Sequence, residues 1–299
     1  MDKTNNTITF SSLIIGMMRF GIWGVDMNTN DLERFIDQCV DLGLTDFDHA
    51  DIYGHYTEEG RFGQVIKRRP DLKSKIQITT KCGIRLVTPN RPDHKIASYN
   101  STKSHILTSA ETSLKELGVD HLDLLLIHRP DYLMQPAEIA EAVEELKQQG
   151  KIKYFGVSNF APSQFELLHS YTPLVNTQIE VSLLHRQPIE DGTLDQCMRL
   201  GAIPTAWSPF GGGAMFVSKS DKPAVQRITK AAQPLQEKYN ATFDQLLLAW
   251  LLKHPSGIVP VLGTTKIDRV ERAKEALSIQ LSHEDWYILL EAAVGEQVP

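Results

Sequence analysis

The most constraining feature of this sequence is a unit that recurs along the chain: a short apolar run, a polar turn and an amphipathic helical stretch. Short apolar strands that alternate with helices pair in parallel, because a helical crossover returns the chain to the same end of the sheet. Eight units within 299 residues therefore predict an α/β fold, a closed (β/α)₈ TIM barrel forming a single domain over residues 1–299. The predicted strands are Leu13–Gly16, Leu44–Asp48, Ile76–Thr80, Asp123–Ile127, Lys153–Val157, Leu174–Gln178, Ile203–Trp207 and Gly257–Val261.

The predicted helices carry recognisable start and stop signals. After the first strand, apolar residues recur at helical spacing, with Asn30 as the expected N-cap and Gly43 as the stop. A later helix is expected to begin at Pro136 and end at Gly150. An open doubly wound sheet would use the same units, but no G-x-G-x-x-G motif follows any strand, which disfavours it.

Two connections are longer than the others, those after the third and seventh strands. The first contains the segment Gly83–Lys103, and the second contains Phe210–Lys222 and an extra helix that ends near Lys253. Extra length in a barrel usually serves the face that carries the site. We therefore expect these long loops to act as lids, with Arg85–Lys103 and Met215–Lys219 shaping a substrate pocket.

Composition narrows the class of protein. The 31 Lys and Arg residues against 37 Asp and Glu give a net charge of −6, without the basic excess of a nucleic-acid binder. The first residues contain no apolar signal segment, and the longest strongly apolar stretch, Leu246–Leu252, is too short to span a membrane. The cysteines, Cys39, Cys82 and Cys197, have neither disulfide nor zinc spacing. We expect a cytoplasmic protein with no nucleic-acid, membrane or metal partner; its oligomeric state stays open.

Polar residues follow the predicted strands at the end where barrel sites form. Asp48, Lys81 and His128 close three neighbouring strands, and Tyr53 lies in the loop after Asp48. A tyrosine is a poor acid at neutral pH, since its ordinary pKa is about 10. The Lys81 ammonium would lower that pKa, Asp48 would hold the lysine, and a neutral His128 would hydrogen-bond a substrate oxygen. These groups can protonate a carbonyl oxygen but cannot supply a hydride, so a cofactor is expected.

Several motifs in order resemble the aldo-keto reductases. They are the strand-end aspartate with its Tyr-Gly loop (DFDHADIYG), the TTK strand, the LLLIH strand and GVSNF at residues 156–160; the ending VGEQVP resembles a bacterial oxidoreductase branch. The resemblance implies an oxidoreductase that reduces an aldehyde or ketone to an alcohol, acting on a small-molecule carbonyl substrate. Its catalytic tetrad would be Asp48, Tyr53, Lys81 and His128, with Tyr53 as the general acid.

The resemblance also implies NADPH as cofactor, lying extended across the barrel mouth, with NADH less favoured. Ser158, Asn159 and Gln178 would hold the nicotinamide carboxamide, and Trp207 would stack on the ring. The pyrophosphate would be wrapped by Ser208, Phe210, Gly211, Gly212 and Gly213. The 2′-phosphate would be clamped by the turn at Gly263 with Thr264, Thr265, Lys266 and Arg269.

Three further residues are expected at the substrate mouth. Arg19 and Trp23 follow the first strand, and Arg129 stands where the family commonly has tryptophan. Two other functions remain open. One is a lyase or aldolase barrel that forms a Schiff base on Lys81, and the other is an NADPH-binding, redox-sensing regulatory subunit. Taken singly, each residue also has an ordinary structural explanation; their gathering at one end of one barrel favours the catalytic interpretation.

Overall fold

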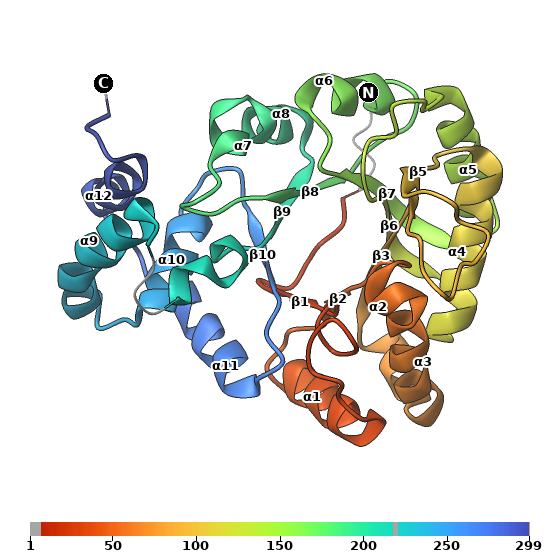
Figure 1. The fold of residues 1–299 in the computed structure, drawn as a ribbon, viewed down its shortest axis with the longest axis horizontal. Helices are drawn as coiled ribbons and strands as arrows, with labels where there is room; N and C mark the ends of the chain where they lie inside the picture. Colours follow the sequence, from red (N-terminus) through yellow and green to blue (C-terminus); the bar gives the residue numbers. More distant parts are fainter. Residues whose placement is uncertain (1–6, 218–220, 299) are drawn as a thin grey trace.

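The computed structural model describes residues 7–217 and 221–298. Within them, eight parallel strands close into a barrel in the order β1-β10-β9-β8-β7-β6-β3-β2 (Figure 1). Each barrel strand overlaps one of the predicted apolar runs, so the predicted (β/α)₈ barrel is confirmed and the open sheet is excluded. The barrel strands are β1 (Ile14–Gly16), β2 (Asp46–Asp48), β3 (Gln77–Cys82), β6 (Leu122–Ile127), β7 (Ile152–Ser158), β8 (Asn176–Glu180), β9 (Ile203–Trp207) and β10 (Val259–Leu262).

Helices surround the strands as the crossover connections require (Figure 1). The helix predicted at Pro136 does begin there. The predicted N-cap Asn30 is wrong: Asn28 is the N-cap, because its backbone is extended and its side chain accepts a hydrogen bond from the Asp31 N–H at 3.0 Å. The helices are α1 (Thr29–Asp41), α2 (Tyr53–Tyr56), α3 (Glu58–Arg68), α4 (Lys103–Leu117), α5 (Pro136–Gln148), α6 (Pro162–His169), α7 (Gln187–Glu190), α8 (Thr193–Leu200), α9 (Pro223–Tyr239), α10 (Phe243–Leu252), α11 (Ile267–Glu275) and α12 (His283–Val294), with 3₁₀ turns at Pro70–Ser74, Gly211–Phe216 and Ala276–Ser278.

One end of the barrel is covered by the segment that precedes β1. Ile8 is buried against Leu124 and Leu126 of β6. Because side chains alternate along a strand, these two leucines point to the opposite face from their apolar neighbours on β6, which belong to the main hydrophobic core. The Ser11 N–H donates to Asp46 at 2.6 Å, and Gln77 donates to the Thr9 carbonyl at 2.9 Å. Because Asp46 and Gln77 begin β2 and β3, this segment crosses the amino ends of the strands. A site is left to form at the carboxyl ends.

The two long connections contain more secondary structure than the sequence predicts. The loop after β3 folds back as an antiparallel pair, β4 (Ile84–Arg85) with β5 (Ser98–Tyr99). The connection after β9 holds two helices, α9 and α10, and α9 packs against α12 beside the barrel (Figure 1). Of the predicted pocket segment Met215–Lys219, residues 218 and 219 lie outside the described residues.

Two tryptophans join α10 to α12. The rings of Trp250 and Trp286 are stacked with centroids 5.0 Å apart. Each indole N–H donates to the other residue's carbonyl, at 3.2 and 2.9 Å. The reciprocal bonds satisfy the donor of the buried Trp250 and that of the half-buried Trp286, and they fix the outer helix to the barrel. No helix in residues 7–217 and 221–298 has the length and apolar character to cross a membrane.

The close approach of α3 to α4 gives a test of this packing. A Cβ on Gly63 would lie 1.9 Å from the backbone oxygen of Glu116, whereas a Cβ on Gly60 would meet only the movable end of the Glu116 side chain, at 2.7 Å. We expect Gly63→Ala to lower the free energy of unfolding by about 1–3 kcal/mol. The control Gly60→Ala is expected to be neutral or stabilising, because alanine favours helix. Urea unfolding of both variants checks this; equal effects would contradict the helix contact.

Candidate active site

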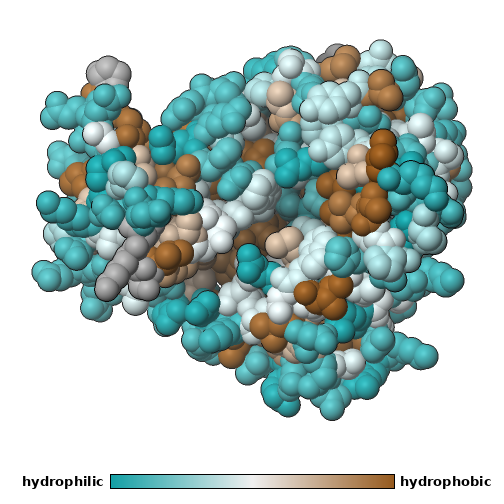
Figure 2. All heavy atoms as spheres, viewed as in Figure 1, coloured by the Kyte–Doolittle hydropathy of each residue, from teal (hydrophilic) through white to brown (hydrophobic). Residues whose placement is uncertain are grey.

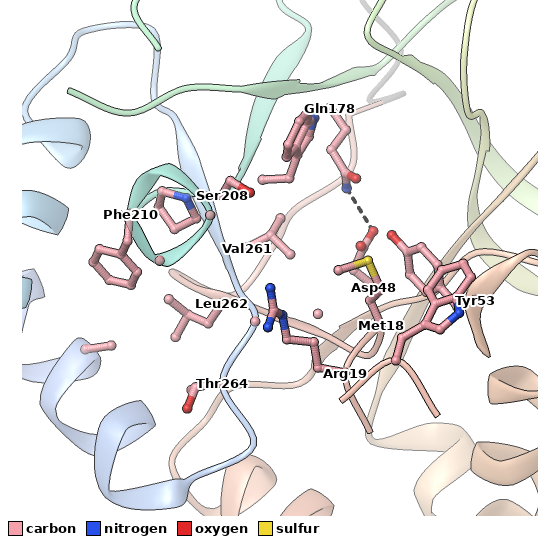
Figure 3. Close-up of a pocket in the computed structure, with 18 of the residues that line it drawn as sticks. Met18, Arg19, Asp48, Tyr53, Gln178, Ser208, Phe210, Val261, Leu262 and Thr264 are labelled. Carbon is pink, nitrogen blue, oxygen red and sulfur yellow. Dashed lines mark hydrogen bonds between the residues drawn. The ribbon is translucent and has the colours of Figure 1, made fainter. Parts of the chain in front are cut away.

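A cavity of about 880 Å³ opens at the carboxyl ends of the strands, and the space-filling view shows the hollow in the middle of that face (Figure 2). Asp48, Tyr53 and Gln178 lie on one side and Ser208 and Phe210 on the other, with Arg19 between them (Figure 3). Most residues predicted for the site line this cavity: Arg19, Trp23, Asp48, Tyr53, His128, Arg129, Ser158, Asn159, Gln178, Trp207, Ser208, Phe210, Gly212, Gly213, Gly263, Thr264 and Arg269.

The remaining predicted residues lie around this cavity. Thr265 and Lys266 line a smaller cavity of about 180 Å³, which shares Arg19 and Arg269 with the large one. Gly211 is absent from the lining but belongs to the same turn as Gly212 and Gly213. Lys81 lies beneath the surface of the large cavity and is fully buried. The sequence therefore placed these groups at one end of the barrel correctly.

The buried Lys81 ammonium is the centre of the site. Its Nζ lies 2.9 and 2.7 Å from the two carboxylate oxygens of Asp48, 2.8 Å from the His49 carbonyl oxygen and 3.2 Å from the Tyr53 hydroxyl oxygen. Lys81 comes from β3, and all of its partners come from the adjacent β2 or the loop that follows it. One ammonium thus holds the acid, the loop backbone and the phenol together.

The charge on Lys81 is stabilised by its partners. Burial alone would lower the pKa of Lys81, but the Asp48 carboxylate and the Tyr53 oxygen raise it, and its pKa lies above the ordinary value. Asp48 is held in turn from across the barrel, because the Gln178 amide on β8 donates to its Oδ1 at 2.8 Å (Figure 3). Gln178 is predicted for the site from the sequence, but its bond to Asp48 is not.

The expected lowering of the Tyr53 pKa is corrected by the structure. Burial raises the pKa of Tyr53 by more than the Lys81 ammonium lowers it, so the pKa lies above its ordinary value. The sequence shows that a cation is near but not that the phenol is almost completely enclosed. Tyr53 therefore keeps its proton at neutral pH and can give it to an oxygen placed in the cavity.

His128 is neutral at the same pH. Burial lowers its pKa well below the ordinary value, and the Lys81 and Arg129 charges lower it further. Its ring lies at 78° to the ring of Tyr53, with centroids 6.0 Å apart. The site therefore combines a charged lysine, a protonated tyrosine and a neutral imidazole, a set that suits protonation of a carbonyl oxygen.

Hydrogen bonds connect the ends of β7 and β9 beside this set. The Asn159 amide donates to the Ser158 hydroxyl at 2.7 Å and to the His128 carbonyl at 3.3 Å, while the Trp207 indole N–H donates to Asn159 Oδ1 at 3.0 Å. Asn159 and Ser208 both have left-handed backbone, with φ of 60° and 52°. Such backbone persists only where its surroundings hold it.

The sequence does not predict how the short segment that carries Tyr53, α2 with its irregular backbone, is held. Gly54, His55 and Tyr56 are consecutive left-handed residues, and this backbone costs about 1–2 kcal/mol for each non-glycine residue. The Tyr56 hydroxyl donates to the Ile84 carbonyl at 3.3 Å and accepts from the Leu86 N–H at 3.0 Å. The long loop after β3 thus anchors the loop that carries Tyr53.

Two more residues of the long loop strengthen this anchor. The Arg91 guanidinium lies 4.3 Å from the centre of the Tyr56 ring, and the Asn90 amide donates to the His55 carbonyl at 2.8 Å. No spacing or motif marks Tyr56 in the sequence, because every one of these partners lies about thirty residues away. The same limit applies to Thr242, Phe243 and Asp244, which line the cavity from the start of α10.

Comparison with known proteins identifies the family. The model of the aldo/keto reductase family matches residues 12–293. The chain belongs to the aldo/keto reductase family. It is 43% identical to an uncharacterized oxidoreductase of Bacillus subtilis, YcsN, over 98% of this chain and 97% of that protein. It is 39% identical to a 6-dehydroglucose reductase of Agrobacterium fabrum, over 98% of each chain.

The solved structures agree with the barrel. A thermostable aldo-keto reductase crystallised with the inhibitor epalrestat is similar with a TM-score of 0.78 and 26% identity, over 95% of each chain. The resemblance noted from the sequence motifs is therefore confirmed. As a member of the aldo/keto reductase family with relatives named as oxidoreductases, the protein is a carbonyl-reducing oxidoreductase.

The Tyr56 anchor is open to a direct test. Tyr56→Phe removes both hydroxyl hydrogen bonds and keeps the ring. We expect it to reduce the free energy of unfolding by about 1 kcal/mol and to lower kcat for carbonyl reduction about tenfold, because Tyr53 is held less firmly. Tyr99→Phe, on β5 of the same loop, is the control and should match the wild type. Unchanged kcat in Tyr56→Phe would show that the anchor does not position Tyr53.

Proposed function

We propose that the protein reduces an aldehyde or ketone to an alcohol with NADPH, and that Tyr53 donates the proton. The observation that carries this proposal is the position of the Lys81 Nζ, which lies 3.2 Å from the Tyr53 hydroxyl oxygen while both Asp48 oxygens hold it. These groups meet at the wall of a cavity large enough for a substrate beside a cofactor.

The residues of the site have distinct roles in this reaction. The Tyr53 hydroxyl and the neutral His128 ring hydrogen-bond the carbonyl oxygen and draw electron density toward it. As the proton leaves Tyr53, the Lys81 ammonium stabilises the phenolate that remains, and Asp48 keeps Lys81 in place. Burial strengthens each of these interactions, because little water competes with them.

The residues of the cavity fit NADPH. Bound NADPH would supply a hydride to the carbonyl carbon. Ser158 and Asn159 lie beside His128 and would bind the carboxamide together with Gln178, and Trp207 offers an aromatic face. A Cβ on Gly212 or Gly213 would meet nothing within 4 Å, so this turn leaves room for a pyrophosphate to approach its backbone.

The preference for NADPH over NADH is supported by cations at the far end of the cavity. Lys266 and Arg269 lie next to Thr264 and Thr265 at the start of α11, and the described part of the chain gives neither cation an acidic partner. Such a group of cations and hydroxyls suits the 2′-phosphate that distinguishes NADPH.

The two alternative functions have less support. A Schiff base requires a neutral lysine amine, and Asp48 instead raises the pKa of Lys81. No feature of residues 7–217 and 221–298 favours the regulatory subunit over catalysis. The name of the 6-dehydroglucose reductase relative makes carbonyl forms of sugars reasonable first substrates to test.

Tyr53→Phe tests the proposed acid. We expect the variant to bind NADPH as the wild type does, measured by quenching of tryptophan fluorescence, and to lose turnover by about 10²- to 10⁴-fold at 340 nm. The control is Tyr154→Phe, whose hydroxyl faces Thr7 at the opposite end of the barrel. Wild-type turnover by Tyr53→Phe would refute the mechanism. Tight NADPH binding by the wild type with no reduction of any carbonyl would favour the regulatory subunit.

The pH dependence of the rate tests the state of His128. Because burial and the neighbouring cations lower its pKa well below 6.5, the ring stays neutral as the pH falls from 7.5 to 6.0. We expect kcat for reduction to change little over this range, since Tyr53 also keeps its proton. A loss of kcat toward low pH with a midpoint near 6.5 would contradict a neutral His128.

A further inference from the structure

Arg129 is a cation at the reacting end of the cavity. It follows His128 directly at the end of β6, lines the cavity and is half-buried. Its guanidinium carbon lies 5.9 Å from the centre of the Trp207 ring, on the face of the indole. Trp207 in turn bonds Asn159, whose amide contacts the backbone of His128. Arg129 therefore belongs to the group of residues around the proposed carbonyl site.

Apart from the Trp207 ring, this guanidinium has no partner within residues 7–217 and 221–298: neither a hydrogen bond nor an ion pair joins it to them. The acids that line the cavity are already paired. Asp48 is bound to Lys81 at 2.7 Å, and Asp244 Oδ2 lies 3.4 Å from Arg272 Nε. The protein therefore presents an uncompensated positive charge to the cavity, where a half-buried cation gains most from an anionic partner.

The proposed cofactor does not provide that partner. The negative charges of NADPH are on its phosphates, and the groups suited to them are the 211–213 turn and the residues from Thr264 to Arg269. The carboxamide end, which Ser158 and Asn159 would hold, carries no negative charge. An anion bound beside Arg129 would therefore come from the other molecule in the cavity, the carbonyl substrate.

We propose that Arg129 forms an oxyanion subsite, and that the substrate is an aldehyde or ketone that also carries a carboxylate or phosphate group. The planar Arg129 guanidinium lies over the Trp207 ring, and a guanidinium can bind two oxygens of one anion at once through its N–H groups. The proposal rests on the proposed reductase function and adds to it the charge class of the substrate. Arg129 determines specificity and takes no part in the proton transfer.

Matched pairs of carbonyl compounds test the subsite. Succinate semialdehyde is compared with butanal, and glyceraldehyde 3-phosphate with glyceraldehyde, in wild type, Arg129→Gln and Arg129→Lys with NADPH. We expect Arg129→Gln to lower kcat/KM for the preferred anionic substrate by roughly 10- to 100-fold, mainly by raising KM, and to change the neutral partner less than twofold. Arg129→Lys should recover part of the loss, and whichever pair responds shows whether the anion is a carboxylate or a phosphate.

A control variant separates the local effect of Arg129 from a general change in the net charge of the protein. Arg199→Gln makes the same change in net charge on the surface of α8, where Arg199 pairs with Glu166, and should alter neither pair. Equal losses for anionic and neutral substrates in Arg129→Gln, or no loss for either, would overturn the subsite while leaving the reductase function standing. Failure of the wild type to reduce either anionic compound would overturn the subsite, whereas only the absence of reduction for every carbonyl compound, sugar aldehydes included, would overturn the reductase function as well.

Discussion

The site depends on one buried ammonium and the oxygens that surround it. Lys81 is completely enclosed, and a lysine in this position is stable as a cation only if its charge is matched. Asp48 supplies the opposite charge, and the His49 carbonyl and the Tyr53 hydroxyl supply further acceptors. Removing one partner of such a pair costs about 3–5 kcal/mol, because a charge is left buried alone. The same contacts that secure β2 against β3 also fix the phenol.

Burial then sets the protonation states around this lysine. It raises the pKa of Tyr53 and lowers that of His128, so both groups stay uncharged at neutral pH while Lys81 stays charged. The two ends of the cavity differ in the chemical groups that they carry. One end carries the proton donor and a neutral imidazole, and the other carries the hydroxyls and cations of the 264–269 turn.

The barrel and the convergence of the tetrad were predictable, whereas the contacts that hold it were not. Strand position follows from short apolar runs, and the residue that ends each run must lie at the carboxyl mouth, so Asp48, Lys81 and His128 were found together. The N-cap was misplaced at Asn30 because two asparagines lie two residues apart and only backbone dihedrals distinguish them. The Tyr56 anchor depends on a loop about thirty residues away. The raised pKa of Tyr53 depends on enclosure, which local sequence does not report.

A double-mutant cycle on Asp48 and Lys81 tests most directly whether this buried pair acts as one unit. The kcat for carbonyl reduction is measured in wild type, Asp48→Asn, Lys81→Met and the double variant, using only folded protein. If the pair works as a unit, the double variant will be no slower than the slower single variant, since the second change removes nothing further. If instead the two losses multiply, each residue acts on its own, and the buried pair is not what the site depends on.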